Sequence, residues 1–281
     1  FTMKKFFLLC ILFFNFTFLY GQITKVMTFN IRYDNPNDEK NSWDNRKNEF
    51  IELIKYYEPD IIGFQEVLAN QLDFINDNLK GYLYVGVGRE DGKRKGEFSP
   101  IFFKKSKYKL VEQNTFWLSD TPEKVSVGWD AALERICTYA ILKKKRSNET
   151  IFIFNTHFDH IGKTARIKSA ELILKKITEI VPDTSIIILM GDFNCLPDEE
   201  PIRKIKEKLF YAAELCLDGV YGPKGTFNSF DEKLIVSDVI DYIFVRNLKV
   251  QKYRHIDDRM KNNNFISDHY PVIMECKKSK K

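Results

Sequence analysis

Polar side chains that could do chemistry follow an apolar run near residue 190. The run "SIIIL" leads into "MGDFNCLPD" (residues 190–198), which presents Asp192, Asn194 and Asp198. Such residues at a strand end are common at the active sites of α/β proteins. Asp and Asn also cap helices and form turns. This stretch alone therefore leaves two interpretations open, a turn or a catalytic cluster.

Five further stretches place similar residues beside or within apolar runs. They are Asn30 in "TFNIR", Glu66 in "FQEV", His157 and Asp159 in "NTHFDH", Asp241 in "VIDYIFV", and Asp268 and His269 in "SDHYPV". Most have an ordinary structural explanation, such as a turn or a helix cap. Asp241 does not, because it lies inside an apolar run, and a buried carboxylate needs a histidine or a metal as partner. One shared site explains the six stretches better than six separate structural roles.

The residue types in these stretches predict hydrolysis of a phosphate ester. The set is rich in oxygen ligands and contains no thiolate, which suits Mg²⁺ or Mn²⁺ better than structural zinc. Such ions polarise phosphoryl oxygens. A histidine can hydrogen-bond to a phosphate oxygen while an aspartate fixes its tautomer, and Asp with Asn can hold and activate a water.

The elements that must position these residues alternate between strands and helices. Short apolar runs predict strands at 23–29, 60–66, 82–87, 99–104, 108–116, 136–142, 151–157, 185–190, 239–245, 250–256 and 271–275. Helical spacing predicts helices near 42–57, 68–79 and 167–181. On the last of these, Ile167, Ala170, Leu174, Ile177 and Val181 share one face. Two packed sheets with helices outside would accommodate so many strands in one domain, residues 22–277.

The glycine after the strand at 185–190 has a predicted role of its own. Gly191 is expected to provide a sharp bend there, because glycine adopts conformations that other residues avoid. The sequence contains no internal repeat or linker long enough to divide the chain. We therefore expect a single domain and a monomer.

The N-terminal segment predicts export. Lys4 and Lys5 precede "FFLLCILFFNFTFLY" (6–20), a pattern typical of a secretory signal cleaved after Gly21. The alternative is a membrane anchor, but a span needs about 20 apolar residues, and Asn15 and Thr17 interrupt this run. We expect a signal peptide at 1–21, a secreted or periplasmic protein without a stable membrane span, and a basic tail at 278–281.

The composition fits an ordinary globular protein, with 44% hydrophobic and 30% charged residues among 281. Removing the two signal lysines takes the formal net charge from +5 to +3, which is too small to indicate nucleic-acid binding by itself. The basic clusters "GKRKG" (92–96) and "KKKR" (143–146) are interpreted as solvated hairpin tips.

The cysteines outside the signal are Cys137, Cys195, Cys216 and Cys276. Their spacing is irregular and contains no CxxC pair, so a thiolate zinc site is not expected. Export would permit disulfides, but the spacing does not assign pairs.

Taken in order, six motifs resemble those of the endonuclease/exonuclease/phosphatase (DNase I-like) superfamily. They are "TFNIR", "PDIIGFQEV", "NTHFDH", "GDFN", "DYIFV" and "SDHYPV", and they span nearly the whole mature chain. The block "NSWDNRKNEFIELIKYYEPDIIGFQEV" is most similar to the deadenylase-like branch and to secreted bacterial members. The resemblance implies a four-layer α/β sandwich, with two mixed β-sheets face to face and helices outside. It also implies a metal-dependent phosphoric ester hydrolase using Mg²⁺ or Mn²⁺.

The resemblance assigns catalytic roles to five residues. Asp192 is expected to orient or deprotonate the water that attacks phosphorus in line, and Asn194 to position it. Asp241 is expected to pair with His269, which would stabilise the phosphate. His157 would contact the phosphate or assist the leaving group.

The resemblance also implies metal-binding and substrate-binding residues. The expected metal ligands are Asn30, Glu66 and Asp268. The expected substrate contacts are Arg32, Arg135 and Asp159, although Asp159 could instead support a residue that contacts the substrate. Arg32 stands where some nuclease relatives have an acidic residue, and a guanidinium there could contact phosphate instead.

Several substrates remain open at this level: a sugar phosphate, a nucleic acid or a lipid headgroup. Export argues against a deadenylase, and the modest charge argues against a dedicated DNA nuclease. A sphingomyelinase-like enzyme would need an exposed apolar docking loop, and the segment 115–130 is only modestly apolar. Its Trp117 and Trp129 could stack on substrate or pack at the rim. A non-catalytic binding module is the remaining alternative, but it predicts missing catalytic residues.

Overall fold

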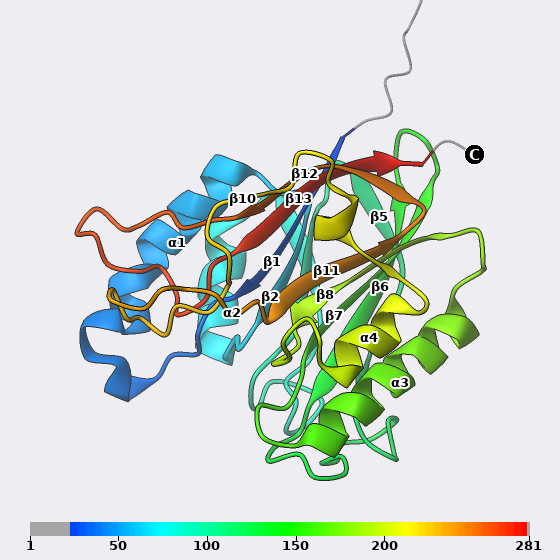
Figure 1. Ribbon diagram of the computed structural model, residues 1–281, viewed down its shortest axis with the longest axis horizontal. Helices are drawn as coiled ribbons and strands as arrows, with labels where there is room; N and C mark the ends of the chain where they lie inside the picture. Colours follow the sequence, from blue (N-terminus) through cyan, green and yellow to red (C-terminus); the bar gives the residue numbers. More distant parts are fainter. Residues whose placement is uncertain (1–22, 280–281) are drawn as a thin grey trace, which may run out of the picture.

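The computed structural model describes residues 23–279, so the predicted signal peptide (1–21) lies outside the described residues, as do residues 280–281. Figure 1 shows two β-sheets packed together, with helices α1 (Trp43–Tyr57) and α2 (Ala69–Asn78) on one outer side and α3 (Lys163–Ile180) and α4 (Glu200–Lys206) on the other. The four-layer α/β sandwich predicted from the sequence is confirmed. None of the helices in the described part of the chain has the length and apolar character of a membrane span.

The first sheet has seven strands in the order β10-β12-β13-β1-β2-β4-β3. Their bounds are β1 (Thr24–Asn30), β2 (Ile61–Gln65), β3 (Tyr82–Val85), β4 (Ile101–Lys104), β10 (Val220–Tyr221), β12 (Leu248–His255) and β13 (Val272–Lys278). The central strand β1 runs parallel to β2 and antiparallel to β13. The carboxyl ends of β1 and β2 therefore meet at one edge.

The second sheet has six strands in the order β5-β6-β7-β8-β11-β9. Their bounds are β5 (Tyr108–Trp117), β6 (Ile136–Lys144), β7 (Thr150–His157), β8 (Ile186–Asp192), β9 (Phe210–Tyr211) and β11 (Asp241–Arg246). Only β7 and β8 pair in parallel, and β11 lies antiparallel to β8. Two 3₁₀ helices, η1 (Pro36–Asn41) and η2 (Ala212–Leu215), lie in the connections.

Alternation along β1 separates the two hydrophobic clusters of the core. Val26 packs in the cluster between the sheets, whereas Met27 and Phe29 pack in the cluster that contains Phe50 of α1. This pattern follows from the period of two along a strand, which sends neighbouring side chains to opposite faces. Both faces of the central strand are therefore buried from Val26 to Asn30.

Some elements differ from the sequence expectations. The seven-residue helix α4 and the two-residue strands β9 and β10 were not predicted, because they are too short to show a periodic pattern. On α3 the buried face includes Ile173, whereas Ile167 and Leu174 are only half-buried. The last strand extends through Lys278, one residue into the predicted basic tail.

Gly191 lies inside strand β8, so the predicted bend is wrong. Its φ is 153°, and a Cβ at this position would collide with the backbone carbonyl oxygen of Thr156 on the neighbouring strand. Glycine is needed there because two backbones approach closely, rather than because the chain turns.

A buried polar network joins the two sheets near the carboxyl ends of β1, β2 and β7. Gln65 Nε2 donates hydrogen bonds to Asn155 Oδ1 (2.7 Å) and Thr28 Oγ1 (3.0 Å). Asn155 Nδ2 in turn donates to the carbonyl oxygens of Phe64 (2.8 Å) and Pro100 (2.9 Å). Such bonds act within a low-dielectric interior, so they fix the position of β7 relative to β2.

The space beside this network predicts the effect of Gly63→Ala. A Cβ at Gly63 would lie 2.6 Å from Asn155 Oδ1 and 2.8 Å from Met190 Cε. We expect a loss of about 1–3 kcal/mol in the free energy of unfolding, measured with urea, because overpacking forces neighbours apart. The control is Gly81→Ala, where a Cβ meets nothing within 4 Å. Equal unfolding midpoints for the two variants would contradict the prediction.

Candidate active site

The strand ends bring the predicted residues to one edge of the sandwich. Strand β7 ends at His157 and β8 at Asp192, and these two residues are in register. Strand β11 begins at Asp241, directly opposite Asp192. Asn30 ends β1 of the facing sheet. The ends of these four strands lie close together, and this brings together residues that are far apart in the sequence.

These strand ends border a cleft of about 750 Å³. The predicted site residues that line it are Arg32, Glu66, Arg135, His157, Asp192, Asn194, Asp268 and His269. Asn30 and Asp241 are buried and hydrogen-bond to residues of the lining. Asp159 is also buried and hydrogen-bonds to Arg135 of the lining, so all eleven predicted residues belong to one cluster.

Three of these residues hold an unfavourable backbone conformation. Arg32 has a φ of 59°, Glu66 of 61° and Asn194 of 47°. Positive φ is costly for a residue with a side chain, and such strain concentrates at functional sites. Each residue follows a strand end, where the chain turns sharply to line the cleft.

Asn30 joins the two sheets at the floor of the site. Its Nδ2 donates to Glu66 Oε1 (3.0 Å) on its own sheet and to Asp192 Oδ2 (2.9 Å) on the facing sheet. Its Oδ1 accepts from the backbone N–H of Arg32 (3.0 Å) and keeps a second lone pair. The amide therefore fixes the orientation of both carboxylates.

A histidine–aspartate couple lies beside Asp192. His269 Nδ1 lies 2.8 Å from Asp241 Oδ2, and its Nε2 lies 3.8 Å from Asp192 Oδ2. Burial lowers the pKa of His269, but the carboxylates of Asp241 and Asp192 outweigh burial and hold the pKa well above its usual value. A protonated imidazole in this position suits the stabilisation of negative charge on a phosphate oxygen.

Asp192 lies between two imidazole rings. Its Oδ1 accepts from the backbone N–H of Asn194 (2.9 Å), and its Oδ2 lies 3.5 Å from His157 Nε2. Burial and the nearby Asp241 carboxylate raise the pKa of Asp192 to about 7. A carboxylate with a pKa near neutrality is suited to accept a proton from water.

His157 is expected to be neutral. The Asn194 amide nitrogen donates to the carbonyl oxygen of Phe158 (3.0 Å) and lies 3.1 Å from His157 Nε2, so this ring nitrogen accepts. Burial, followed by the guanidinium groups of Arg135 and Arg89, lowers the pKa of His157. The two histidines of the site therefore carry different charges, which suits different roles.

The predicted metal ligands fit a divalent cation. Burial raises the pKa of Asp268, the neighbouring His269 opposes the rise, and the Glu66 carboxylate adds to it. Glu66 is only half-buried and lines the cleft, where its oxygens accept from Asn30 and from the Tyr33 backbone N–H. The carboxylates of Glu66 and Asp268 and the Asn30 amide oxygen would supply the hard oxygen donors that Mg²⁺ prefers.

A second group of possible ligands comprises Asp192, Asp241 and His269, whose ligand atoms lie within 4.8 Å of one another. Asp241 and His269 already share a hydrogen bond through these atoms. The two carboxylates hold the pKa of His269 well above its usual value, and a protonated imidazole does not bind a cation, so we assign this group to acid–base chemistry.

The predicted substrate contacts have different placements. Arg32 lines the cleft and is held by Asp38 through two hydrogen bonds of 2.9 and 3.0 Å. Arg135 also lines the cleft. Asp159 is buried, and its Oδ1 accepts from Arg135 Nε (3.1 Å), while Oδ2 accepts from the backbone of Gly162 (2.7 Å). Asp159 therefore orients Arg135, which is the supporting role among the two expected for it.

The sequence interpretation missed two arginines. Arg89 lines the cleft and pairs with Glu97 at 2.8 Å. Arg46 of α1 is fully buried and donates to the carbonyl oxygens of Ile31 and Ile266, both at 2.8 Å. It thereby ties the loop after β1 to the segment before His269. The spacing of residues on α1 could have indicated that Arg46 is buried, because it lies four residues before Phe50 and so on the same buried face of the helix.

A cleft that combines acid–base couples with hard oxygen ligands on a four-layer sandwich defines a hydrolase of phosphate esters. The model of the Endonuclease/Exonuclease/phosphatase family matches residues 27–269, and the chain belongs to this family. Members of the family depend on a divalent metal and hydrolyse phosphate esters. The family predicted from the sequence motifs is therefore confirmed.

Known proteins of several kinds are similar to this chain. A mannosyl-6-phosphatase of Bacteroides thetaiotaomicron VPI-5482 is 37% identical, with a TM-score of 0.86 over 90% of this chain and 99% of that one. An uncharacterised protein of Acanthamoeba polyphaga mimivirus is 29% identical over 250 residues, covering 83% of this chain and 91% of the relative. The human nocturnin catalytic domain, at 22% identity, has a TM-score of 0.73 and covers 92% of this chain and 94% of its own. The last likeness shows the fold alone.

The Asp241–His269 couple predicts the effect of Asp241→Asn. The amide cannot hold a protonated imidazole as the carboxylate does, so we expect kcat to fall by about 10²–10⁴. Phosphate release from a chromogenic phosphate ester measures the effect, and thermal unfolding checks that the fold is intact. The control is Asp238→Asn, an exposed residue three positions earlier. Equal rates for the two variants would remove the couple from the mechanism.

Proposed function

We propose that this chain is an exported phosphatase that removes phosphate from a sugar phosphate. The proposal rests on one observation. The same cleft is lined by arginine side chains that can bind phosphate and by carboxylates that can bind a divalent metal ion. The sugar phosphate is supported by the relative at 37% identity whose name is mannosyl-6-phosphatase. That similarity covers 90% of this chain and 99% of the relative's chain.

The geometry supports distinct roles for the residues of the cleft. Asp192, with a pKa near 7, would accept the proton of a water that Asn194 positions. His269, held protonated by Asp241, would stabilise the charge that develops on the phosphate. Neutral His157 faces the same space and would contact the phosphate or assist the leaving oxygen.

The residues for the cofactor are Glu66, Asp268 and Asn30. When bound there, Mg²⁺ or Mn²⁺ would neutralise negative charge on the phosphoryl oxygens and favour in-line attack. Arg32 and Arg135 line the same cleft and supply further positive charge for the substrate phosphate.

The lining of the cleft supports a small substrate in preference to a nucleic acid. A volume of about 750 Å³ lies within the range of small-molecule sites, about 300–1,000 Å³. Trp117 is buried and donates its Nε1–H to the Arg89 carbonyl oxygen (2.7 Å), and Trp129 donates to Asp120 (3.0 Å). Neither tryptophan lines the cleft, so neither is placed there to stack on a base.

The substrate proposal is tested with a panel of phosphate esters. With Mg²⁺ or Mn²⁺ we expect release of inorganic phosphate from mannose 6-phosphate, and a chelator should abolish it. Hydrolysis of RNA or DNA without release from sugar phosphates would contradict the proposal.

The metal role is tested by Glu66→Gln, which removes a charged ligand. We expect activity to fall by about 100-fold or more. Replacing a residue that only hydrogen-bonds to a metal ligand already costs about 10–100-fold, and losing a ligand should cost at least as much. Raising the metal concentration should restore part of the rate. The control is Glu123→Gln, an exposed residue outside the cleft. Unchanged metal dependence in Glu66→Gln would exclude this residue as a ligand.

Export rests on the sequence of residues 1–21, which lie outside the described residues. Expressed in full in a Gram-negative host, the chain should appear in the periplasm or medium with Gln22 as its first residue. Intact mass spectrometry measures this, and a chain starting at Gln22 serves as the cytoplasmic control. Recovery of the uncut chain from the cytoplasm would contradict the proposal.

A further inference from the structure

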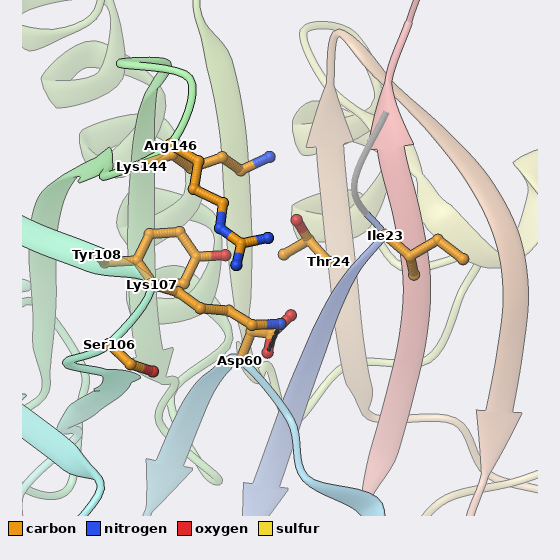
Figure 2. Close-up of a pocket in the computed structure, with 8 residues that line it drawn as sticks. All are labelled: Ile23, Thr24, Asp60, Ser106, Lys107, Tyr108, Lys144 and Arg146. Atoms are coloured by element: carbon orange, nitrogen blue, oxygen red, sulfur yellow. Dashed lines mark ion pairs between the residues drawn. The ribbon is translucent and has the colours of Figure 1, made fainter. Parts of the chain in front are cut away.

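A polar cavity of about 190 Å³ lies at the opposite end of the strands from the active site. Figure 2 shows it beside the start of β1, the turn before β2, the start of β5 and the end of β6. The active-site cleft borders the other ends of β1 and β2. The two cavities therefore share no residue, and the inference drawn from this one does not depend on the proposed function.

Asp60, on one side of the cavity, is a buried carboxylate that two lysines share. Its Oδ1 lies 2.7 Å from Lys107 Nζ and 3.5 Å from Lys104 Nζ, and its Oδ2 accepts from the backbone N–H of Lys25 (3.1 Å). The Asp60 charge is therefore neutralised by its own neighbours, and it offers little repulsion to an anion in the cavity.

Glu149 is shared in the same way near the end of β6. Its carboxylate lies 2.8 Å from Lys144 Nζ and 3.2 Å from Lys278 Nζ. Lys144 also lines the cavity. Two carboxylates are thus matched by four lysines, which leaves two positive charges in excess.

Arg146 adds a third positive charge. Within residues 23–279, no carboxylate oxygen forms an ion pair with its guanidinium group, although the residue lines the cavity. Figure 2 shows this group between the side chains of Tyr108 and Thr24, with the Tyr108 hydroxyl pointing toward it. Tyr108 and Thr24 are buried and line the same cavity as Arg146.

We propose that this cavity binds a phosphate group. A guanidinium fork, two ammonium groups and two hydroxyls form the donor set that recognises a tetrahedral oxyanion. The excess of positive charge around the cavity attracts an anion, and the volume accommodates one phosphate with its nearest substituent. The cluster "KKKR" lies at an exposed hairpin turn, as expected from the sequence, and its Lys144 and Arg146 also line this cavity.

Calorimetric titration of the metal-free full chain with inorganic phosphate tests the proposal. We expect saturable binding that weakens as NaCl is raised, because salt screens the charges. Arg146→Gln should bind phosphate about tenfold more weakly, the factor for one charge-assisted contact. The Mg²⁺-dependent hydrolysis rate should not change, because Arg146 lies outside the active-site cleft.

The matched control is Arg94→Gln, an exposed arginine in the other basic cluster, which pairs with Asp73 outside the cavity. A parallel titration with mannose 6-phosphate distinguishes a site for the free anion from one for an esterified phosphate, and Arg146-dependent binding of either supports the proposal. Crystals soaked in tungstate should show the oxyanion beside Arg146. Tungstate found only in the active-site cleft, or equal phosphate affinity in Arg146→Gln and wild type, would overturn the proposal.

Discussion

The hydrogen bond from Asn30 to Asp192 is the contact on which the site depends, because it joins the two sheets where the chemistry is assembled. The bond is 2.9 Å long and buried, and the same amide group also holds Glu66 at 3.0 Å. The inter-sheet network of Gln65 and Asn155 fixes the spacing of the sheets below it. A small sliding of one sheet against the other would separate the expected metal ligands from the group that activates water.

Burial and charge together set the protonation states within this frame. Asp192 and Asp241 lie close enough to raise the pKa of Asp192, while both stabilise the protonated form of His269. Burial, followed by the guanidinium groups of Arg135 and Arg89, lowers the pKa of His157. His157 at the end of β7 and His269 before β13 therefore have pKa values shifted in opposite directions, and one cleft can contain both a proton acceptor and a fixed positive charge.

The sequence located most of the site because strand ends leave a readable pattern. An apolar run followed by Asp192, or by His157, marks the edge of a buried strand whatever the rest of the chain does. Asp159 shows where this reasoning fails. It follows the same run as His157, but its carboxylate accepts from Arg135 and from backbone N–H groups, so it lies behind the lining of the cleft and not in it. The direction in which a loop side chain points depends on contacts that the sequence pattern does not contain.

The sequence by itself determined the family, the sandwich and the types of residue available for catalysis, because apolar periodicity and ordered motifs are local properties. Only the tertiary structure showed that Gly191 is required by the Thr156 backbone of a neighbouring strand. It alone revealed that Arg46 is fully buried and connects two loops, and that Arg146 shares a cavity with Asp60. These features join residues from separate strands and loops, and such contacts exist only once the sheets have packed.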